Sequence, residues 1–170
     1  MIRPILIHPD PRLKKVAPPV ADLTDGLRAL ADDMLETMYE APGIGLAAPQ
    51  IGQGVRLFVM DCADKEEAPA PFVMFNPEIT ARSDDQSVYE EGCLSIPEIY
   101  AEVTRPAEVT LAWIDRDGNP QSRDFAGLEA TCVQHELDHL DGKLFIDYLG
   151  SVKRQMITNK MKKLKKARAS

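Results

Sequence analysis

The segment that most constrains the fold of this chain is 127–141, where the letters HELDH place His135 and His139 four residues apart. Gly142 follows, and glycine is typical just beyond the end of a helix. At helical spacing the segment has two distinct faces. The first is apolar and suited to core packing: Ala130, Val133, Leu137 and Leu140, followed by Leu144. The second carries both imidazoles beside small or apolar side chains: Leu128, Thr131, Cys132, His135 and His139. The pattern predicts a central helix that packs with one face and presents two histidines with another.

The motif HExxH has two histidines one helical turn apart and a glutamate directly after the first. Such a pair of histidines typically binds one shared metal ion. The alternative is a pair of ordinary half-buried histidines. A catalytic metal needs a third protein ligand, yet no histidine follows His139 and the only other one is His8. The residues alone do not decide which side chain is the third ligand. The candidates are a distant carboxylate, Asp141, Asp147, Cys62 and Cys93.

Cys93 is distinguished by its surroundings, "YEEGCLSIPE". Gly92 permits a close approach of the backbone, and Pro97 limits regular strand pairing just beyond. A thiolate in such a turn, with glutamates before it, would be stabilised by a cation. The alternative is a small buried hydrophobic side chain, which is common for a cysteine in a reducing compartment.

A second unusual stretch is "APGIGLAAPQIG" at 41–52. Its glycines and alanines leave room for something close to the backbone, but it lacks the phosphate-loop pattern and does not follow a strand. Gln50 near its end offers an uncharged amide donor, which is what a developing oxyanion needs. The alternative is a small-residue turn beneath a helix.

The remaining sequence predicts one α+β domain. Residues 24–43 have an apolar helical face, with Thr24 placed as the cap and Pro42-Gly43 as the end. Asp117-Gly118 predicts a hairpin returning along "QSRDFA", and a third helix is expected over 151–167. Strand-like runs lie at 55–61, 72–79, 99–105 and 108–115. We expect antiparallel sheets around the central helix, with further helices toward the N- and C-terminal ends.

Composition limits the possible locations and partners. No apolar run reaches the length of a membrane span, and the first residues lack the apolar core of a signal peptide. Three cysteines, an odd and low number, favour reduced thiols and a cytoplasmic protein. Residues 152–170 hold eight Lys or Arg and no acid, whereas the rest of the chain holds twelve against 27 Asp or Glu, a formal charge of −15. An acidic body with a basic tail does not indicate DNA or membrane binding.

Three stretches together, "GIGLAAPQ" (43–50), "EGCLS" (91–95) and "QHELDHL" (134–140), resemble the peptide deformylases in order and separation. "HPDPRLKKVA" near the start and "GKLFIDYL" after the central helix also resemble that family. The resemblance covers essentially the whole chain. It implies a catalytic domain over 1–150 and a basic helix or tail of the same domain over 151–170.

The resemblance also implies a role for each matching residue. Cys93, His135 and His139 would bind one divalent metal, with water in the fourth position. Glu136 would be the general base and acid, and Gln50 with the backbone N–H of Leu94 would hold the oxyanion. Gly45 would offer backbone contacts to the substrate. The pocket for the first side chain would be built from six residues: Ile44, Tyr89, Glu91, Leu128, Thr131 and Cys132.

The reaction implied is removal of the formyl group from N-formyl-methionine on a new polypeptide, which releases formate. The resemblance implies Fe(II) as the native metal, with zinc, nickel or cobalt able to occupy the same Cys-His-His set. The implied partners are N-formyl-methionyl nascent peptides and, through the basic C-terminal helix, the ribosome. The alternative for that helix is loose docking on the body, with Val152, Met156, Ile157, Met161 and Leu164 along one side.

Two other functions share parts of this pattern. A zincin endopeptidase shares HExxH, but its third ligand is usually a downstream histidine or glutamate, and none follows His139. A non-catalytic module with structural zinc normally has four protein ligands and needs neither Glu136 nor Gln50.

Overall fold

The computed structural model describes residues 1–169, so Ser170 of the predicted tail lies outside the described residues. The described residues form three α-helices: α1 (Asp25–Glu40), α2 (Gly127–Leu140) and α3 (Ser151–Ala169). Short 3-10 helices lie at Pro11–Lys14 (η1), Ala48–Ile51 (η2) and Phe145–Tyr148 (η3). The strands are β1 (Gly45–Ala47), β2 (Leu57–Met60), β3 (Phe72–Arg82), β4 (Gln86–Cys93), β5 (Ile96–Pro106), β6 (Glu108–Ile114) and β7 (Pro120–Ala126).

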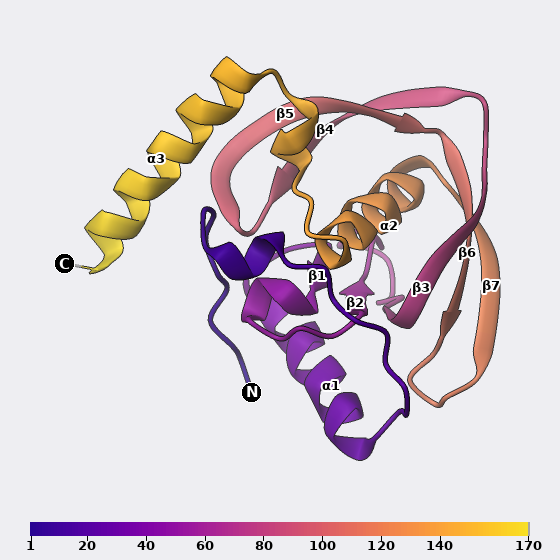
Figure 1. Cartoon of the computed structure of the whole chain (residues 1–170). Coiled ribbons are helices and arrows are strands. Elements are labelled where there is room, and N and C mark those ends of the chain that lie inside the picture. The colour runs from indigo at the N-terminus through magenta and orange to yellow at the C-terminus, as the bar shows by residue number, and fades with distance from the viewer. Residues whose placement is uncertain (170) are drawn as a thin grey trace.

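The strands form two antiparallel sheets around α2. One sheet has the order β1-β2-β3-β6-β7, and the other is the hairpin β4-β5. α2 lies at the centre of the molecule, with the hairpin on one side and the larger sheet on the other (Figure 1). The predicted α+β domain with a central helix is confirmed.

Hydrogen bonds and backbone angles at the helix ends and turns agree with the predicted elements. The Thr24 side chain accepts a hydrogen bond from the backbone N–H of Leu27 and caps α1 as expected. The loop at Asp117 and Gly118 joins β6 to β7, with Gly118 at φ +89°. Gly142 ends α2 at φ +76°, and a Cβ there would lie 2.5 Å from the carbonyl oxygen of Lys14. Only glycine fits this position without a shift of the backbone.

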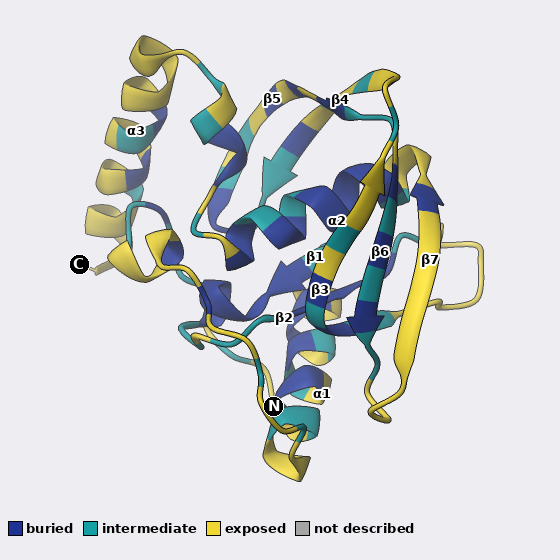
Figure 2. Cartoon of the chain, turned by 45° about the vertical axis from the view of Figure 1, so that its right-hand side comes forward, coloured by how far each residue is buried: buried dark blue, intermediate teal, exposed yellow. Residues whose placement is uncertain are grey.

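Three packed clusters hold the elements together. The predicted apolar face of α2 packs on the larger sheet with Phe58, Met60 and Phe125. α1 covers β1, β2 and η2. The third cluster joins the β4-β5 hairpin, η3 and α3: Ile96, Ala101, Val103, Leu144, Phe145, Ile146, Ile157 and Met161. Buried residues therefore concentrate along α2 and the strands that face it, whereas β7 is mostly exposed (Figure 2).

Some local predictions were incomplete or wrong. Strands β1 and β4 were not anticipated, and β4 is where Cys93 lies. Ile157 and Met161 of α3 are buried, but Val152 and Met156 are exposed, so the prediction of one apolar side for all five residues was wrong. The helix packs on the body through Ile157 and Met161, and the Thr158 hydroxyl also hydrogen-bonds the His8 ring at 2.9 Å. No helix within residues 1–169 has the length and apolarity to cross a membrane.

Candidate metal centre and active site

Three side chains from two elements converge on one point. Cys93 ends β4, just before the tight Leu94-Ser95 turn into β5, and His135 and His139 lie one turn apart on α2. Their ligand atoms all lie within 4.8 Å of one another. The two Nε2 atoms are 3.2 Å apart, and Cys93 Sγ is 3.4 Å from His139 Nε2.

This arrangement fits a metal ion. Tetrahedral bonds of ~2.0–2.1 Å to imidazole and ~2.3 Å to thiolate separate the donor atoms by roughly 3.3–3.6 Å. The separations of 3.2 and 3.4 Å are close to these values. Two imidazole nitrogens and a sulfur that face one another at this range are a donor set for a cation rather than an apolar packing contact.

The orientation of His135 is set by a buried network of charges. Its Nδ1 lies 3.0 Å from Glu91 Oε1, so an N–H there donates to the carboxylate and leaves Nε2 free for a metal. Arg105 donates to both Glu91 oxygens at 2.7 and 2.9 Å. Asp138 accepts from Arg105 at 2.8 Å and from the Tyr148 hydroxyl at 2.7 Å, which closes the network back onto α2.

The surroundings shift the pKa values of the two histidines in opposite directions. Burial lowers the pKa of His139 well below its usual value, and the neighbouring His135 lowers it further. For His135, burial also acts to lower the pKa, but hydrogen bonds with Cys93 and Glu91 raise it overall. Within the described chain, the His139 Nδ1 is buried without a hydrogen-bond partner. The neutral imidazole favoured at His139 is the form that binds metals.

Glu136 is buried beside this donor set and does not belong to it. Its side chain lines the cavity, and its Oε1 has no hydrogen-bond partner among residues 1–169. Oε1 lies 3.9 Å from His139 Nε2. Burial raises the pKa of Glu136 to about 7. On the opposite wall is Gly45, where a Cβ would lie only 2.6 Å from Glu136 Oε2.

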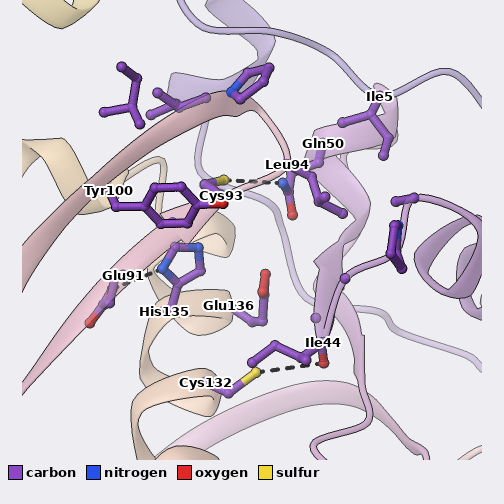
Figure 3. Close-up of a pocket in the computed structure, with 18 of the residues that line it drawn as sticks. Ile5, Ile44, Gln50, Glu91, Cys93, Leu94, Tyr100, Cys132, His135 and Glu136 are labelled. Carbon is purple, nitrogen blue, oxygen red and sulfur yellow. Dashed lines mark hydrogen bonds and ion pairs between the residues drawn. The ribbon is translucent and has the colours of Figure 1, made fainter. Parts of the chain in front are cut away.

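Gln50 is fixed on η2 with its amide nitrogen toward the thiol. Its Oε1 accepts from the backbone N–H of Ala47 at 2.9 Å. Its Nε2 donates to Cys93 Sγ at 3.4 Å, as Figure 3 shows, and to Ser95 Oγ at 3.1 Å. Because the oxygen is already engaged, the amide keeps one orientation and presents N–H groups to the site.

The site opens into a cavity of about 770 Å³. Glu136, Gln50, Leu94 and Gly45 line it, together with Cys93 and His135. His139 is almost completely buried behind them. All six residues expected to build the side-chain pocket also line the cavity: Ile44, Tyr89, Glu91, Leu128, Thr131 and Cys132. Both Glu91 oxygens, however, are engaged by Arg105 and His135.

The other candidate ligands lie apart from this donor set. Asp141 pairs with Arg56, and Asp147 pairs with Lys14, each at 3.0 Å. Cys62 packs against the cluster that includes Cys132.

Comparison with known proteins identifies the family. The model of the polypeptide deformylase family matches residues 2–155. This chain belongs to the peptide deformylase family. It is 56% identical over 168 residues to a peptide deformylase of Mesorhizobium japonicum, covering 99% of this chain and 96% of the relative. It is 53% identical over 169 residues to that of Brucella suis, covering 99% and 97%.

Solved structures agree with the sequence relatives. A peptide deformylase of Legionella pneumophila superposes with a TM-score of 0.90 at 46% identity, covering 99% of this chain and 98% of the other. One from Ehrlichia chaffeensis in complex with actinonin has a TM-score of 0.91 at 36% identity, covering 95% and 96%. The chain is therefore an enzyme, a hydrolase that removes the N-formyl group from newly synthesised polypeptides.

The sequence did not reveal the residues that hydrogen-bond the side chains of this deformylase site or their partners. Arg105, Asp138 and Tyr148 were not singled out, and Ser95 beside Gln50 was overlooked. Arg105 could have been suspected, because it is a lone cation in a strand of otherwise alternating pattern. The position of Tyr148 depends on how η3 returns beside the hairpin, which no local pattern indicates.

Proposed function

We propose that Cys93, His135 and His139 hold one divalent metal ion and that Glu136 is the general base and acid of deformylation. The observation that supports this most strongly is the convergence of the three ligand atoms beside a buried carboxylate that has an unengaged oxygen. When bound, the ion supplies a Lewis acid that polarises a carbonyl oxygen and lowers the pKa of water.

The side chains then have separate tasks. Glu136 takes the proton of the attacking water and later delivers it to the nitrogen of the leaving amine, so one carboxylate serves as base and then acid. Gln50 Nε2 and the backbone N–H of Leu94 donate to the developing oxyanion. Gly45 allows the substrate backbone to approach Glu136, since any larger residue would occupy that space.

The methionine side chain of the substrate enters the cavity beside α2. Ile44, Leu128 and Cys132 supply apolar contact, and Tyr89 and Thr131 bound the pocket. Glu91 has no free oxygen for this purpose. We propose that it acts on the substrate only through His135, whose tautomer and orientation it fixes.

The proposed native metal is Fe(II), with zinc, nickel or cobalt able to replace it. A thiolate with two imidazoles suits all four ions, so the donor set supports a transition metal but does not select one. Enzyme loaded with Fe(II) should lose activity in air as iron and Cys93 are oxidised, whereas nickel-loaded enzyme should survive. Equal decay of the two forms would contradict iron at a thiolate site.

The test of the catalytic assignment is Glu136→Gln with formate release from formyl-Met-Ala-Ser as the assay. The variant should keep its metal and fold and lose roughly 10²–10⁴-fold in turnover. Unchanged turnover with normal metal content would remove Glu136 from the mechanism. For the wild-type protein, internal cleavage of longer peptides would indicate an endopeptidase. No formate release by wild-type protein with a stably bound metal would indicate a structural metal site.

We also propose that residues 1–150 form the catalytic part and that α3, in 151–170, belongs to the same domain and contacts the ribosome. Its outward face carries Lys153, Lys160 and Lys163 beside the exposed Met156. Basic side chains gain affinity for RNA by releasing counterions from phosphates, and this gain falls steeply with salt. Such a partner also places the enzyme in the cytoplasm, where nascent chains emerge.

The ribosome proposal is tested by reversing charge rather than by truncation, because α3 is packed into the body. The variant Lys153→Glu, Lys160→Glu, Lys163→Glu should lose co-sedimentation with ribosomes at low salt while still deformylating short peptides. Unaltered co-sedimentation of the triple variant would contradict this role.

A further inference from the structure

The buried face of α3 leads directly to the substrate cavity. Positions 157, 161, 164 and 168 are spaced i, i+4, i+7 and i+11, so they share one side of the helix. Ile157 is 6% exposed and Met161 3% exposed, and Leu164 packs with them in the cluster that includes the hairpin. Arg168 is next along this side, and it lines the same cavity as Glu136 and His135. The last turn of α3 therefore contributes one residue, Arg168, to the lining of the substrate site.

The charge of Arg168 is available for a ligand. Within residues 1–169, its guanidinium makes neither an ion pair nor a side-chain hydrogen bond. The other arginine of the cavity, Arg3, is different, because Asp33 accepts from two of its nitrogens at 3.1 and 2.9 Å. The remaining charges at the mouth are the exposed glutamates Glu40, Glu90 and Glu98. Arg168 is thus one unpaired cation beside an acidic rim.

The cavity reaches from the metal centre to the end of α3. Its volume is about 770 Å³, and its lining includes His135 and Glu136 as well as Arg168. Each residue of an extended chain adds about 3.3–3.6 Å of length. Downstream residues of a nascent chain must therefore pass the outer wall, where α3 ends.

We propose that α3 takes part in substrate selection and that Arg168 binds a carboxylate side chain of the nascent polypeptide downstream of formyl-methionine. This inference rests on the proposed function of the site. A guanidinium is a planar, permanently charged donor that pairs with a carboxylate through two parallel hydrogen bonds. The glutamates repel acidic side chains elsewhere on the rim, so the preference for Asp is confined to the position that faces Arg168.

The experiment measures kcat/KM for formyl-Met peptides that carry a single Asp, Asn or Lys at each of positions two to five. These peptides are amidated at the C-terminus, so the only added carboxylate is the side chain, and a parallel series ends in a free carboxylate. At one position, wild-type enzyme should prefer Asp to Lys by roughly two- to fivefold, as expected for a solvent-accessible charge pair. Higher salt should reduce this ratio.

Variants on one helix provide the controls. Arg168→Ala should abolish the Asp-to-Lys ratio, and Arg168→Glu should invert it. Arg154→Ala removes the same charge from α3 fourteen residues away, about 21 Å along the helix, and should preserve the ratio. Arg154 does not line the cavity.

Three results would overturn the proposal: no preference for Asp at any position, the same ratio in the Arg168→Ala and Arg154→Ala enzymes, or an effect of Arg168 that appears only with free-acid peptides. The last result would mean that Arg168 recognises a terminal carboxylate, which a nascent chain does not offer. Failure of the catalytic assignment is distinguishable, because it would appear as undiminished turnover of the Asn peptides by Glu136→Gln.

Discussion

Replacing Gly45 by alanine should displace the catalytic carboxylate without altering its chemistry. The added Cβ would lie 2.6 Å from Glu136 Oε2 and 2.9 Å from its carboxyl carbon. Ordinary van der Waals contact begins at roughly 3.4 Å, so the carboxylate must retreat by about 0.8 Å. Gly45 does not have the positive φ found at four other glycines, so alanine suits its backbone. A displacement approaching 1 Å at a reacting group can reduce the rate by up to ~100-fold. We expect a loss of roughly 10- to 100-fold in kcat/KM, or about 1.4–2.7 kcal/mol of transition-state stabilisation.

The assay is formate release from formyl-Met-Ala-Ser, with metal content and melting temperature measured on the same preparations. Gly54→Ala is the matched control, because a Cβ there has no heavy atom within 4 Å. This control should retain wild-type kcat/KM. Wild-type turnover by Gly45→Ala, with normal metal content, would show that the position of Glu136 Oε2 does not govern the rate. The general acid–base role assigned to Glu136 would then be wrong.

The remaining predictions test the donor set, the buried network and the N-terminal segment. Cys93→Ala should lose most of its metal, whereas Cys62→Ala and Cys132→Ala should retain it; the reverse pattern in metal analysis would refute the ligand set. Arg105→Leu leaves Glu91 and Asp138 buried without their cation and should lower the free energy of unfolding by about 3–5 kcal/mol in urea titrations. Arg116→Leu, which breaks an exposed pair with Asp32, should cost only about 0–1 kcal/mol, and equal losses would contradict the argument. Burial lowers the pKa of His8 to about 4, so the stability associated with its neutral form is complete above pH ~6.5 and falls as the pH drops toward 4, by up to about 3 kcal/mol. His8→Gln should remove this component from the pH profile, and an unchanged profile would show that His8 does not cause it.

The parts of the site predictable from sequence are those that one helix carries by itself. The separation of His135 and His139 fixes their common face, and the apolar stripe of α2 fixes which side is buried. The third ligand could not be derived in this way. Cys93 is brought to the histidines by packing of a hairpin 42 residues upstream. Its surroundings in the sequence make it a candidate, but only resemblance to a family selects it as the ligand.

The missed strand β4 has a physical reason. On the less exposed side of β4, where a regular amphipathic strand would be apolar, two positions carry polar or acidic residues, Ser87 and Glu91. Glu91 is one of them, and it is buried only because Arg105 lies across the hairpin to neutralise it. Propensity and periodicity describe a residue and its near neighbours along the chain, so they cannot anticipate a carboxylate that is paired across two strands.

The hairpin β4-β5 explains why α3 belongs with the metal centre. Cys93 and Glu91 lie on the same strand. The register of this hairpin therefore positions one proposed ligand, Cys93, and also the hydrogen-bond partner of a second, His135. The hairpin shares no strand pairing with the larger sheet, and a two-stranded hairpin is marginally stable alone. Its position depends on the Arg105 network and on the apolar cluster that Ile157 and Met161 of α3 complete against Ile96. Removing α3 would uncover that cluster and loosen the strand that carries Cys93. An experiment on a truncated enzyme could therefore not separate loss of a ribosome contact from loss of the metal site. Substitutions on the outward face of α3 leave the cluster intact, and for this reason they separate the two functions of the helix.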